Sequence, residues 1–165
     1  MIIEKPDEQV YALLKRLQIK YVRYEHRPVF TIEQAELLNL KTCATRCKNL
    51  FLRNKKGNQH YLVIMEHFKF LDLKRLSFQI GSNALSLASA ERMLNLLGIA
   101  AGAVGPFGLM NDKEKQVTVL IDRELRTSSS VSFHPNVNTV TIESSFSDFQ
   151  NYLAWCSNKV LYVDI

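Results

Sequence analysis

The middle of the chain carries two apolar segments joined by a short polar turn, and this pattern restricts the fold more than any other feature. Residues 49–53 (NLFLR) and 61–66 (YLVIME) are rich in β-forming side chains. The residues between them, 54–58 (NKKGN), are polar and include a glycine, as is typical of a tight turn. The pattern predicts a β-hairpin and therefore a sheet that is at least partly antiparallel.

Helices and further strands are interspersed along the rest of the chain. Helical periodicity and end signals predict helices near residues 7–18, 31–38, 72–81, 89–98 and 146–155. β-forming residues predict strands at 19–25, 117–122, 138–143 and 160–163, while 102–112 and the Ser-rich 127–130 are expected to be loop and turn. Without a repeat or a linker, residues 1–165 are expected to form a single α+β domain with a mixed, largely antiparallel sheet and packed helices.

Most of the predicted helices begin or end at a recognisable cap. Thr31 followed by Gln34 fits a capping box. Asp72 and Ser89 are expected to cap the next two helices, and Gly98 is placed to end the second of them. Asp7, directly after Pro6, is the predicted N-cap of the first helix.

Composition limits the classes of protein to which this chain can belong. Hydrophobic residues make up 47% of its 165 residues, which is enough for one sizeable core, and no apolar run reaches the ~18 residues of a membrane span. The N-terminal residues lack the apolar stretch of a signal peptide, and three cysteines cannot all pair internally, so a cytoplasmic location is expected and no membrane contact. The net charge of +5 suits a polyanionic partner without identifying one.

Metal and thiol chemistry are weakly indicated. The four histidines are dispersed, and Cys43 and Cys47 lie four residues apart, a spacing that would place both thiols on one face of a helix. Without further ligands nearby, buried reduced thiols are favoured over a zinc site, so no metal and no cofactor is expected. A Cys–His nucleophile stays open because Lys48 beside Cys47 would lower a thiol pKa, although no known nucleophile motif surrounds it.

Three features carry the remaining candidate chemistry. The segment 102-GAVGPFGLMND-112 contains three glycines and a proline, so it is either an ordinary turn or a loop that aims backbone N–H groups at an oxyanion. Lys48 begins a strand, where a lysine is commonly solvated. His134 precedes a strand in a polar loop, where a histidine commonly bonds to backbone.

Together these segments resemble the YbaK and prolyl-tRNA-synthetase editing-domain family of aminoacyl-tRNA deacylases. The similarity runs over most of the chain, through 25-EHRPVFTIEQA-35, 48-KNLFL-52, 61-YLVIM-65, 86-SLASAERMLNLLG-98, 102-GAVGPFGL-109, 121-IDREL-125 and 133-FHPNVNTVTI-142. The Lys-Asn-Leu-Phe-Leu strand and the Gly-x-x-x-Pro loop are its most specific motifs. The Pro-Phe-Gly-Leu and Phe-His-Pro-Asn segments are most similar to the alanyl-tRNA(Pro) deacylase branch, known as ProXp-ala or PrdX.

The resemblance implies hydrolysis of the ester between a wrong amino acid and the 3′ adenosine of a tRNA, without metal, cofactor or covalent intermediate and with help from the substrate's own ribose hydroxyl. It implies a functional lysine at Lys48, a loop glycine at the substrate carbonyl at Gly102 and a late histidine at His134. Substrate-binding positions follow at Thr31, Asn49, Gly105, Pro106 and Phe107. Ile32, Leu50 and Phe107 are candidate walls of a tight amino-acid pocket, and each is equally plausible as core.

The function implied is freestanding trans-editing, a translation-fidelity activity, most specifically on Ala-tRNA(Pro). Partners implied are the acceptor end of mischarged tRNA(Pro) and, as a candidate, prolyl-tRNA synthetase, with no DNA. The same chemistry on Cys- or Ser-tRNA is one alternative. A non-catalytic module that binds tRNA or a synthetase is another. Retention of Lys48, Gly102 and His134 favours the enzyme, and two departures from the family pattern at Cys47 and Gly105 leave the binding module open. The predicted site would place Lys48, Gly102 and His134 in one concavity.

Overall fold

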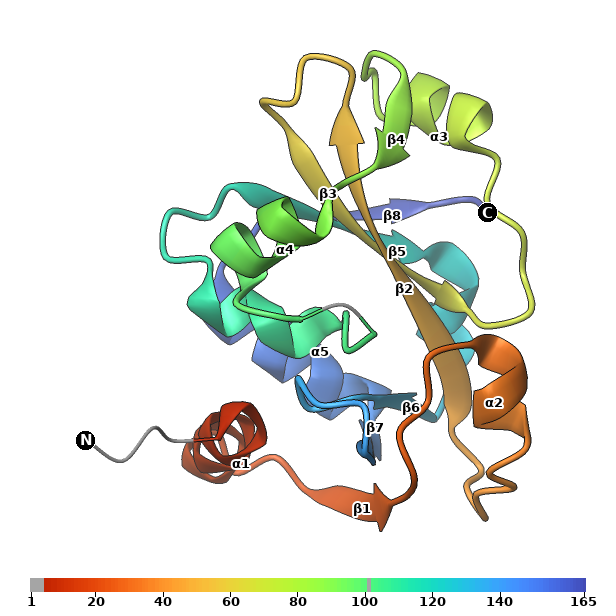
Figure 1. The fold of residues 1–165 in the computed structure, drawn as a ribbon, viewed down its shortest axis with the longest axis vertical. Coiled ribbons are helices and arrows are strands. Elements are labelled where there is room, and N and C mark those ends of the chain that lie inside the picture. The colour runs from red at the N-terminus through yellow and green to blue at the C-terminus, as the bar shows by residue number, and fades with distance from the viewer. Residues whose placement is uncertain (1–4, 101) are drawn as a thin grey trace.

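A computed structural model describes residues 5–100 and 102–165, except for the side chain of Ile32. Eight strands form one mixed sheet in the order β1-β7-β6-β2-β3-β5-β8, and β4 pairs with β2 outside this path (Figure 1). The strands are β1 (Tyr21–Glu25), β2 (Thr45–Asn54), β3 (His60–Glu66), β4 (Leu85–Leu87), β5 (Val117–Asp122), β6 (Ser130–Phe133), β7 (Val140–Ser145) and β8 (Val160–Val163). The α+β class and the mixed, mostly antiparallel sheet are therefore confirmed.

The predicted hairpin is the longest feature of the sheet. β2 and β3 pair antiparallel from Cys47 opposite Glu66 to Arg53 opposite His60, and β2 begins four residues before its predicted start (Figure 1). The turn is held by Asn54, whose side-chain oxygen accepts hydrogen bonds from the backbone amides of Asn58 and Gln59. A side chain that replaces two missing backbone partners keeps a short turn in one conformation.

Parallel pairing enters where helices connect the strands. β3 pairs with β5 and β5 with β8 in parallel, and each connection is long enough to cross over the sheet. The strands β4 and β6 were not expected from the sequence, and β7 begins two residues later than the predicted strand. β6 begins at Ser130, the last residue of the Ser-rich turn, because its backbone pairs with β7 along its whole length and with β2 at Val131 and Ser132.

In the described part of the chain, five α-helices pack on the sheet, together with two 3-10 helices. They are α1 (Pro6–Arg16), α2 (Ile32–Glu36), α3 (Leu73–Gln79), α4 (Ala90–Leu97) and α5 (Phe146–Cys156), with η1 at Pro106–Asn111 and η2 at Arg123–Thr127. Side chains of Thr31, Asp72 and Ser89 accept bonds from helix amides, and Gly98 adopts a left-handed conformation, so these four predicted caps are confirmed. The predicted cap at Asp7 is wrong, because Pro6 is already helical and Lys5 takes the N-cap position.

The two faces of the β2–β3 hairpin support two apolar clusters. Phe51, Leu62 and Ile64 belong to the larger cluster, which also contains buried residues of α1, α4 and α5. Leu52 and Met65 belong to the smaller cluster with Leu76 of α3. Because side chains alternate along a strand, Asn49 lies on the face of the larger cluster and Lys48 on the face of the smaller one.

Among the described residues, no helix is both long and apolar enough to cross a membrane.

Candidate active site

Two adjoining hollows lie beside β2, where that strand passes between its two short partners. β6 pairs with β2 only at Thr45 and Arg46, and β4 pairs with it only from Leu52 onward. The segment between these pairings lines an inner cavity and an outer pocket. Four residues line both hollows: Ala35, Cys47, Asn49 and His134.

The inner cavity is small and largely apolar. Its volume is about 90 Å³, several times the ~10–15 Å³ that one water molecule requires. Leu38 and Leu40 line it from the segment after α2, and Phe133 lines it from β6. Arg46 and the hydroxyl groups of Thr42, Ser132 and Thr141 add polarity. The Thr42 hydroxyl already donates to Glu143 at 2.6 Å, and Thr141 bonds to His26 at 2.9 Å. A small side chain is the kind of group that this cavity fits.

The outer pocket is larger and open. Its volume is about 490 Å³, and Lys48, Gly102 and His134 all line it, together with Thr31 and Asn49. The structure thus brings together the three residues that the sequence predicted to share one concavity, although they lie far apart in the chain. Their roles in binding and catalysis stay predictions.

His134 is held in one protonation form by its neighbours. Its Nδ1 lies 2.7 Å from the carbonyl oxygen of Val140, and a carbonyl only accepts, so Nδ1 carries the proton and Nε2 is the basic nitrogen. Burial lowers the pKa of His134, and the His26 ring 5.6 Å away adds to this shift. At neutral pH His134 is therefore a neutral imidazole that can accept a proton or a hydrogen bond.

Lys48 reaches the outer pocket from the opposite face of β2. Its Nζ donates a hydrogen bond to the carbonyl oxygen of Lys69 and lies 5.7 Å from the centre of the Phe70 ring. Burial lowers the pKa of the Lys48 ammonium. Lys48 is thus a partly desolvated cation held by the loop after β3, at the margin of the pocket rather than at its centre.

The Gly-rich loop faces the pocket with only part of its length. Gly102 has φ +89°, and a Cβ there would lie 3.1 Å from the Phe30 ring. The Ala103 amide donates to the Ala100 carbonyl and Pro106 has no N–H, which leaves the amides of Gly102, Val104 and Gly105 as candidate oxyanion donors.

The second half of that loop belongs to the core, which corrects its predicted role as a binding surface. Phe107 is 3% exposed and packs edge-on against Phe133 and Tyr152. The carbonyl of Pro106 accepts a hydrogen bond of 2.9 Å from the buried Tyr152 hydroxyl. These residues anchor the loop, whereas Leu50 does line the outer pocket; the Ile32 side chain lies outside the described residues.

Several pocket residues escaped the sequence analysis. Phe30, Leu38, Leu40, Thr42, Ser132 and Thr141 line the hollows, and none of them was named as a site residue from the sequence, although Phe30 and Thr141 lie within the similar segments. Asn49 gives a structural signal that a sequence cannot, because its side-chain oxygen is buried with no hydrogen-bond partner in the described part of the chain. Such orphaned acceptors are uncommon in native proteins and often mark functional positions.

The cysteines are placed unfavourably for chemistry. Cys43 is exposed in the loop before β2 and Cys47 lies within that strand, so the predicted shared helical face is wrong. In the ranges 5–100 and 102–165, no three His, Cys, Asp or Glu side chains are grouped to hold a metal ion. Burial raises the pKa of the Cys47 thiol to about 12, with the Glu66 charge adding to the shift, so this thiol is protonated at neutral pH.

Replacing Cys47 by serine is therefore expected to slow deacylation by less than about tenfold, or ~1.4 kcal/mol of activation free energy. A protonated thiol is a poor nucleophile, and serine nearly preserves its volume in the cavity wall. Single-turnover deacylation, measured beside a thermal melt, checks this result. Complete loss of activity in a folded Cys47→Ser protein would instead establish thiol chemistry.

Comparisons with known proteins identify the family of this chain. The aminoacyl-tRNA editing domain matches residues 26–152. "Prolyl-tRNA editing protein ProX" of Acetoanaerobium sticklandii is 43% identical over 158 residues, which cover 96% of each chain. "Prolyl-tRNA synthetase associated domain-containing protein 1" of Danio rerio is 34% identical over 150 residues, covering 88% of this chain and 80% of the relative.

The fold has solved counterparts as well. A crystal structure described as a proposed trans-editing enzyme for prolyl tRNA synthetase superposes with a TM-score of 0.71, at 18% identity, over 99% of each chain. At that identity the match concerns the fold alone. Since the family domain spans most of the chain and the bacterial relative is similar over nearly its whole length, the chain belongs to the aminoacyl-tRNA editing domain family and is an aminoacyl-tRNA deacylase.

Proposed function

We propose that this protein is a freestanding trans-editing enzyme that hydrolyses the ester of mischarged tRNA(Pro), with alanine as the amino acid it removes. The observation that carries the proposal is the small cavity of about 90 Å³ that adjoins the open pocket. The 43% identity to a prolyl-tRNA editing protein supports the choice of tRNA. Association with prolyl-tRNA synthetase stays a prediction.

The two hollows suit the two parts of such a substrate. The inner cavity takes the amino-acid side chain, and the outer pocket takes the terminal adenosine. A synthetase pocket built for proline cannot exclude the smaller alanine, because a missing methylene discriminates by only ~1–3 kcal/mol. In this proposal a second pocket, which accepts alanine and rejects proline by the shape of its walls, removes the error. Leu38, Leu40 and Phe133 supply the apolar walls that set this limit.

The outer pocket provides groups that match ester hydrolysis. Negative charge develops on the carbonyl oxygen, and the amides of Gly102, Val104 and Gly105 are the candidates to stabilise it, with ~3–4 kcal/mol per donor as the scale in other enzymes. The Lys48 ammonium binds the 3′ end by its charge. The neutral His134 accepts a hydrogen bond from the water or from the ribose. Asn49, with its unpaired oxygen, accepts from the substrate's ammonium group.

Aromatic side chains at the mouth are suited to an unpaired RNA end. Phe30 lines the outer pocket and is 68% exposed, and Phe70, beside the Lys48 ammonium, is 93% exposed. Unpaired bases stack on such rings, commonly contributing ~1–3 kcal/mol per base. These two phenylalanines therefore support binding of the single-stranded 3′ end rather than of a free amino-acid ester.

Acidification is expected to destabilise the protein below pH ~6.5, the ordinary pKa of histidine. Burial lowers the pKa of His134 in the folded state, so the unfolded chain binds the proton first. The stability associated with a neutral His134 is therefore complete above ~6.5 and is lost as the pH falls below it. Melting temperatures from pH 8 to pH 5 measure this loss.

Burial also lowers the pKa of His60, so His60 contributes to the same loss of stability at low pH. A variant of His134 is therefore needed to separate the two contributions. The slope of melting temperature against pH is expected to be shallower in His134→Gln than in the wild type. Equal slopes in the two proteins would mean that His134 titrates normally in the folded state.

A panel of charged tRNA(Pro) substrates tests the proposed function. Single-turnover hydrolysis is measured with alanine, cysteine, serine and proline on the same tRNA. If the proposal is right, the alanyl ester is hydrolysed rapidly and the prolyl ester is not. Faster hydrolysis of the cysteinyl or seryl ester would mean that one of these, and not the alanyl ester, is the substrate. Tight binding of tRNA with no hydrolysis of any ester would make the protein a binding module.

A further inference from the structure

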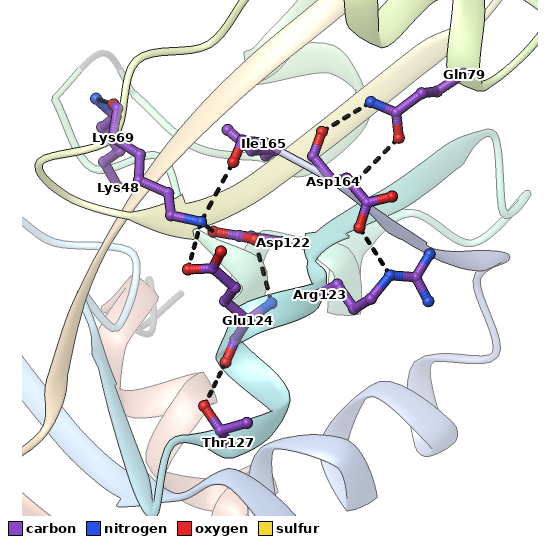
Figure 2. Close-up of polar contacts among 9 residues, drawn as sticks. All are labelled: Lys48, Lys69, Gln79, Asp122, Arg123, Glu124, Thr127, Asp164 and Ile165. Carbon is purple, nitrogen blue, oxygen red and sulfur yellow. Dashed lines mark hydrogen bonds and ion pairs between the residues drawn. The ribbon is translucent and has the colours of Figure 1, made fainter.

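Lys69, in the loop between β3 and α3, directs its side chain into the protein. Figure 2 shows this side chain running from beside Lys48 to an acidic group at the end of β5. Its Nζ lies 2.8 Å from an oxygen of Asp122 and 2.8 Å from one of Glu124, and it donates to the carbonyl of Ile165 at 3.3 Å. Two segments far apart in the chain, the end of β5 and the C-terminus, thus meet at one ammonium group.

The partners of Lys69 differ in strength because they differ in burial. The Asp122 side chain is 1% exposed and that of Lys69 is 15% exposed, whereas Glu124 is 73% exposed. Water screens a pair as exposed as Lys69–Glu124, so the Asp122 pair dominates. Burial by itself lowers the pKa of Lys69, but the hydrogen bonds and charges of Asp122 and Glu124 outweigh it and raise this pKa. Lys69 is therefore firmly charged and anchored.

The backbone of the same residue faces the active site. The Lys69 carbonyl accepts the hydrogen bond from the Lys48 ammonium. Its chain neighbours Phe68 and Phe70 are 62% and 93% exposed, so their side chains do little to fix the loop. The buried ion pair acts together with the hydrogen bond of 3.2 Å from the Lys69 amide to the Glu66 carbonyl, and it is the side-chain contact that holds the Lys69 carbonyl where the Lys48 ammonium meets it.

We propose that Lys69 is a positioning residue for Lys48: its ion pair with buried Asp122 fixes the loop whose carbonyl orients the Lys48 ammonium. The inference rests on the proposed function, because it takes Lys48 as a working group of the deacylase. It predicts that a change at Lys69 affects the reaction through Lys48 and through no other route.

A double-mutant cycle tests this dependence. Lys69→Met is expected to slow single-turnover hydrolysis of Ala-tRNA(Pro) about tenfold when Lys48 is present, a coupling of the size that contacting residues show. In the Lys48→Ala background the same change should alter the rate by less than about twofold. Equal losses in both backgrounds would overturn the proposal. Lys69→Arg, which keeps the charge beside Asp122, is expected to recover part of the rate.

A second variant separates positioning from folding. Lys69→Met leaves Asp122 buried without its cation, which destabilises a protein. Adding Asp122→Asn removes the unpaired charge, so the melting temperature should recover while the rate stays low. A rate that recovers together with the melting temperature would show a purely structural role. Arg123→Met is the matched control, since it breaks the neighbouring exposed pair with Asp164 (Figure 2) and should leave the rate unchanged.

A measurement that needs no substrate keeps this test separate from the proposed function. Reductive methylation of Lys48, followed by mass spectrometry, reports how freely its amine is available. Release of the loop in Lys69→Met is expected to raise the labelling rate of Lys48 several-fold, with that of Lys56 as the internal reference. If wild-type protein fails to hydrolyse any ester, the proposed function fails alone. An unchanged labelling rate refutes the positioning role.

Discussion

Replacing Lys48 by alanine is expected to slow deacylation of Ala-tRNA(Pro) about a hundredfold, which corresponds to ~3 kcal/mol of lost positioning or transition-state stabilisation. The ammonium lies at the margin of the outer pocket, and in the proposed function its charge holds the 3′ end. Stability should change little. The variant loses one hydrogen bond to the Lys69 carbonyl, a loss of about 1 kcal/mol, which lowers the melting temperature by ~2–4 °C.

The measurement pairs single-turnover hydrolysis with a thermal melt. Lys48→Arg should recover only part of the rate, because a planar guanidinium places its donors differently from an ammonium. Lys56→Ala, which removes an exposed lysine from the β2–β3 turn, is the matched control for lost charge. A wild-type rate in Lys48→Ala would remove this lysine from the site. A collapsed melting temperature would show that it serves the fold.

Gly102→Ala is expected to slow deacylation by about a hundredfold, the scale on which other enzymes respond to the loss of one oxyanion donor. At φ +89° a side chain is strained by ~1–3 kcal/mol, and the added Cβ would lie 3.1 Å from the Phe30 ring. The loop relieves both strains by shifting, which moves the amides of Gly102 and Val104 away from the substrate carbonyl.

Two other glycines supply matched controls for this loop substitution. Gly81 has φ +63°, and a Cβ added there would meet no atom within 4 Å, so Gly81→Ala introduces backbone strain away from the pocket and should leave the rate unchanged. Gly105 has an extended backbone that any residue adopts, and an added Cβ would lie 3.5 Å from the His134 carbonyl, so Gly105→Ala places a side chain in the same loop without backbone strain and should fold normally. Rates of Gly102→Ala equal to those of Gly81→Ala would show that the loop position does not govern catalysis.

The features that the sequence predicted well are those determined over a few residues. Thr31, Asp72 and Ser89 cap helices through bonds to amides two or three residues away, and Gly98 ends a helix because it tolerates a left-handed backbone. The hairpin follows from two β-forming segments and a turn whose bonds are local. The motifs at Lys48, Gly102 and His134 identified the family, because a motif is recognised by the order and spacing of its residues along the chain.

Long-range contacts decided the rest. β4 and β6 are short, and their sequences show no clear strand pattern. They become strands because β2 offers unpaired backbone groups to both of them and β7 offers such groups to β6. The motif predicted Phe107 as a pocket wall, but its ring packs in the core against the rings of Phe133 and Tyr152. No local pattern distinguishes an apolar residue that packs against distant strands from one that faces a ligand.

The sequence by itself therefore determined the helix caps, the central hairpin, the α+β class and the family of this protein, because each depends on neighbours in the chain. Only the tertiary structure decided the parallel strand pairs, the inner cavity beside β2 and the direction of the Lys48 side chain. It also decided that Lys69, a loop residue that no motif marks, meets Asp122 from a strand far along the chain. The physical reason is that burial and charge pairing act through space, whereas capping and turn formation act along the backbone.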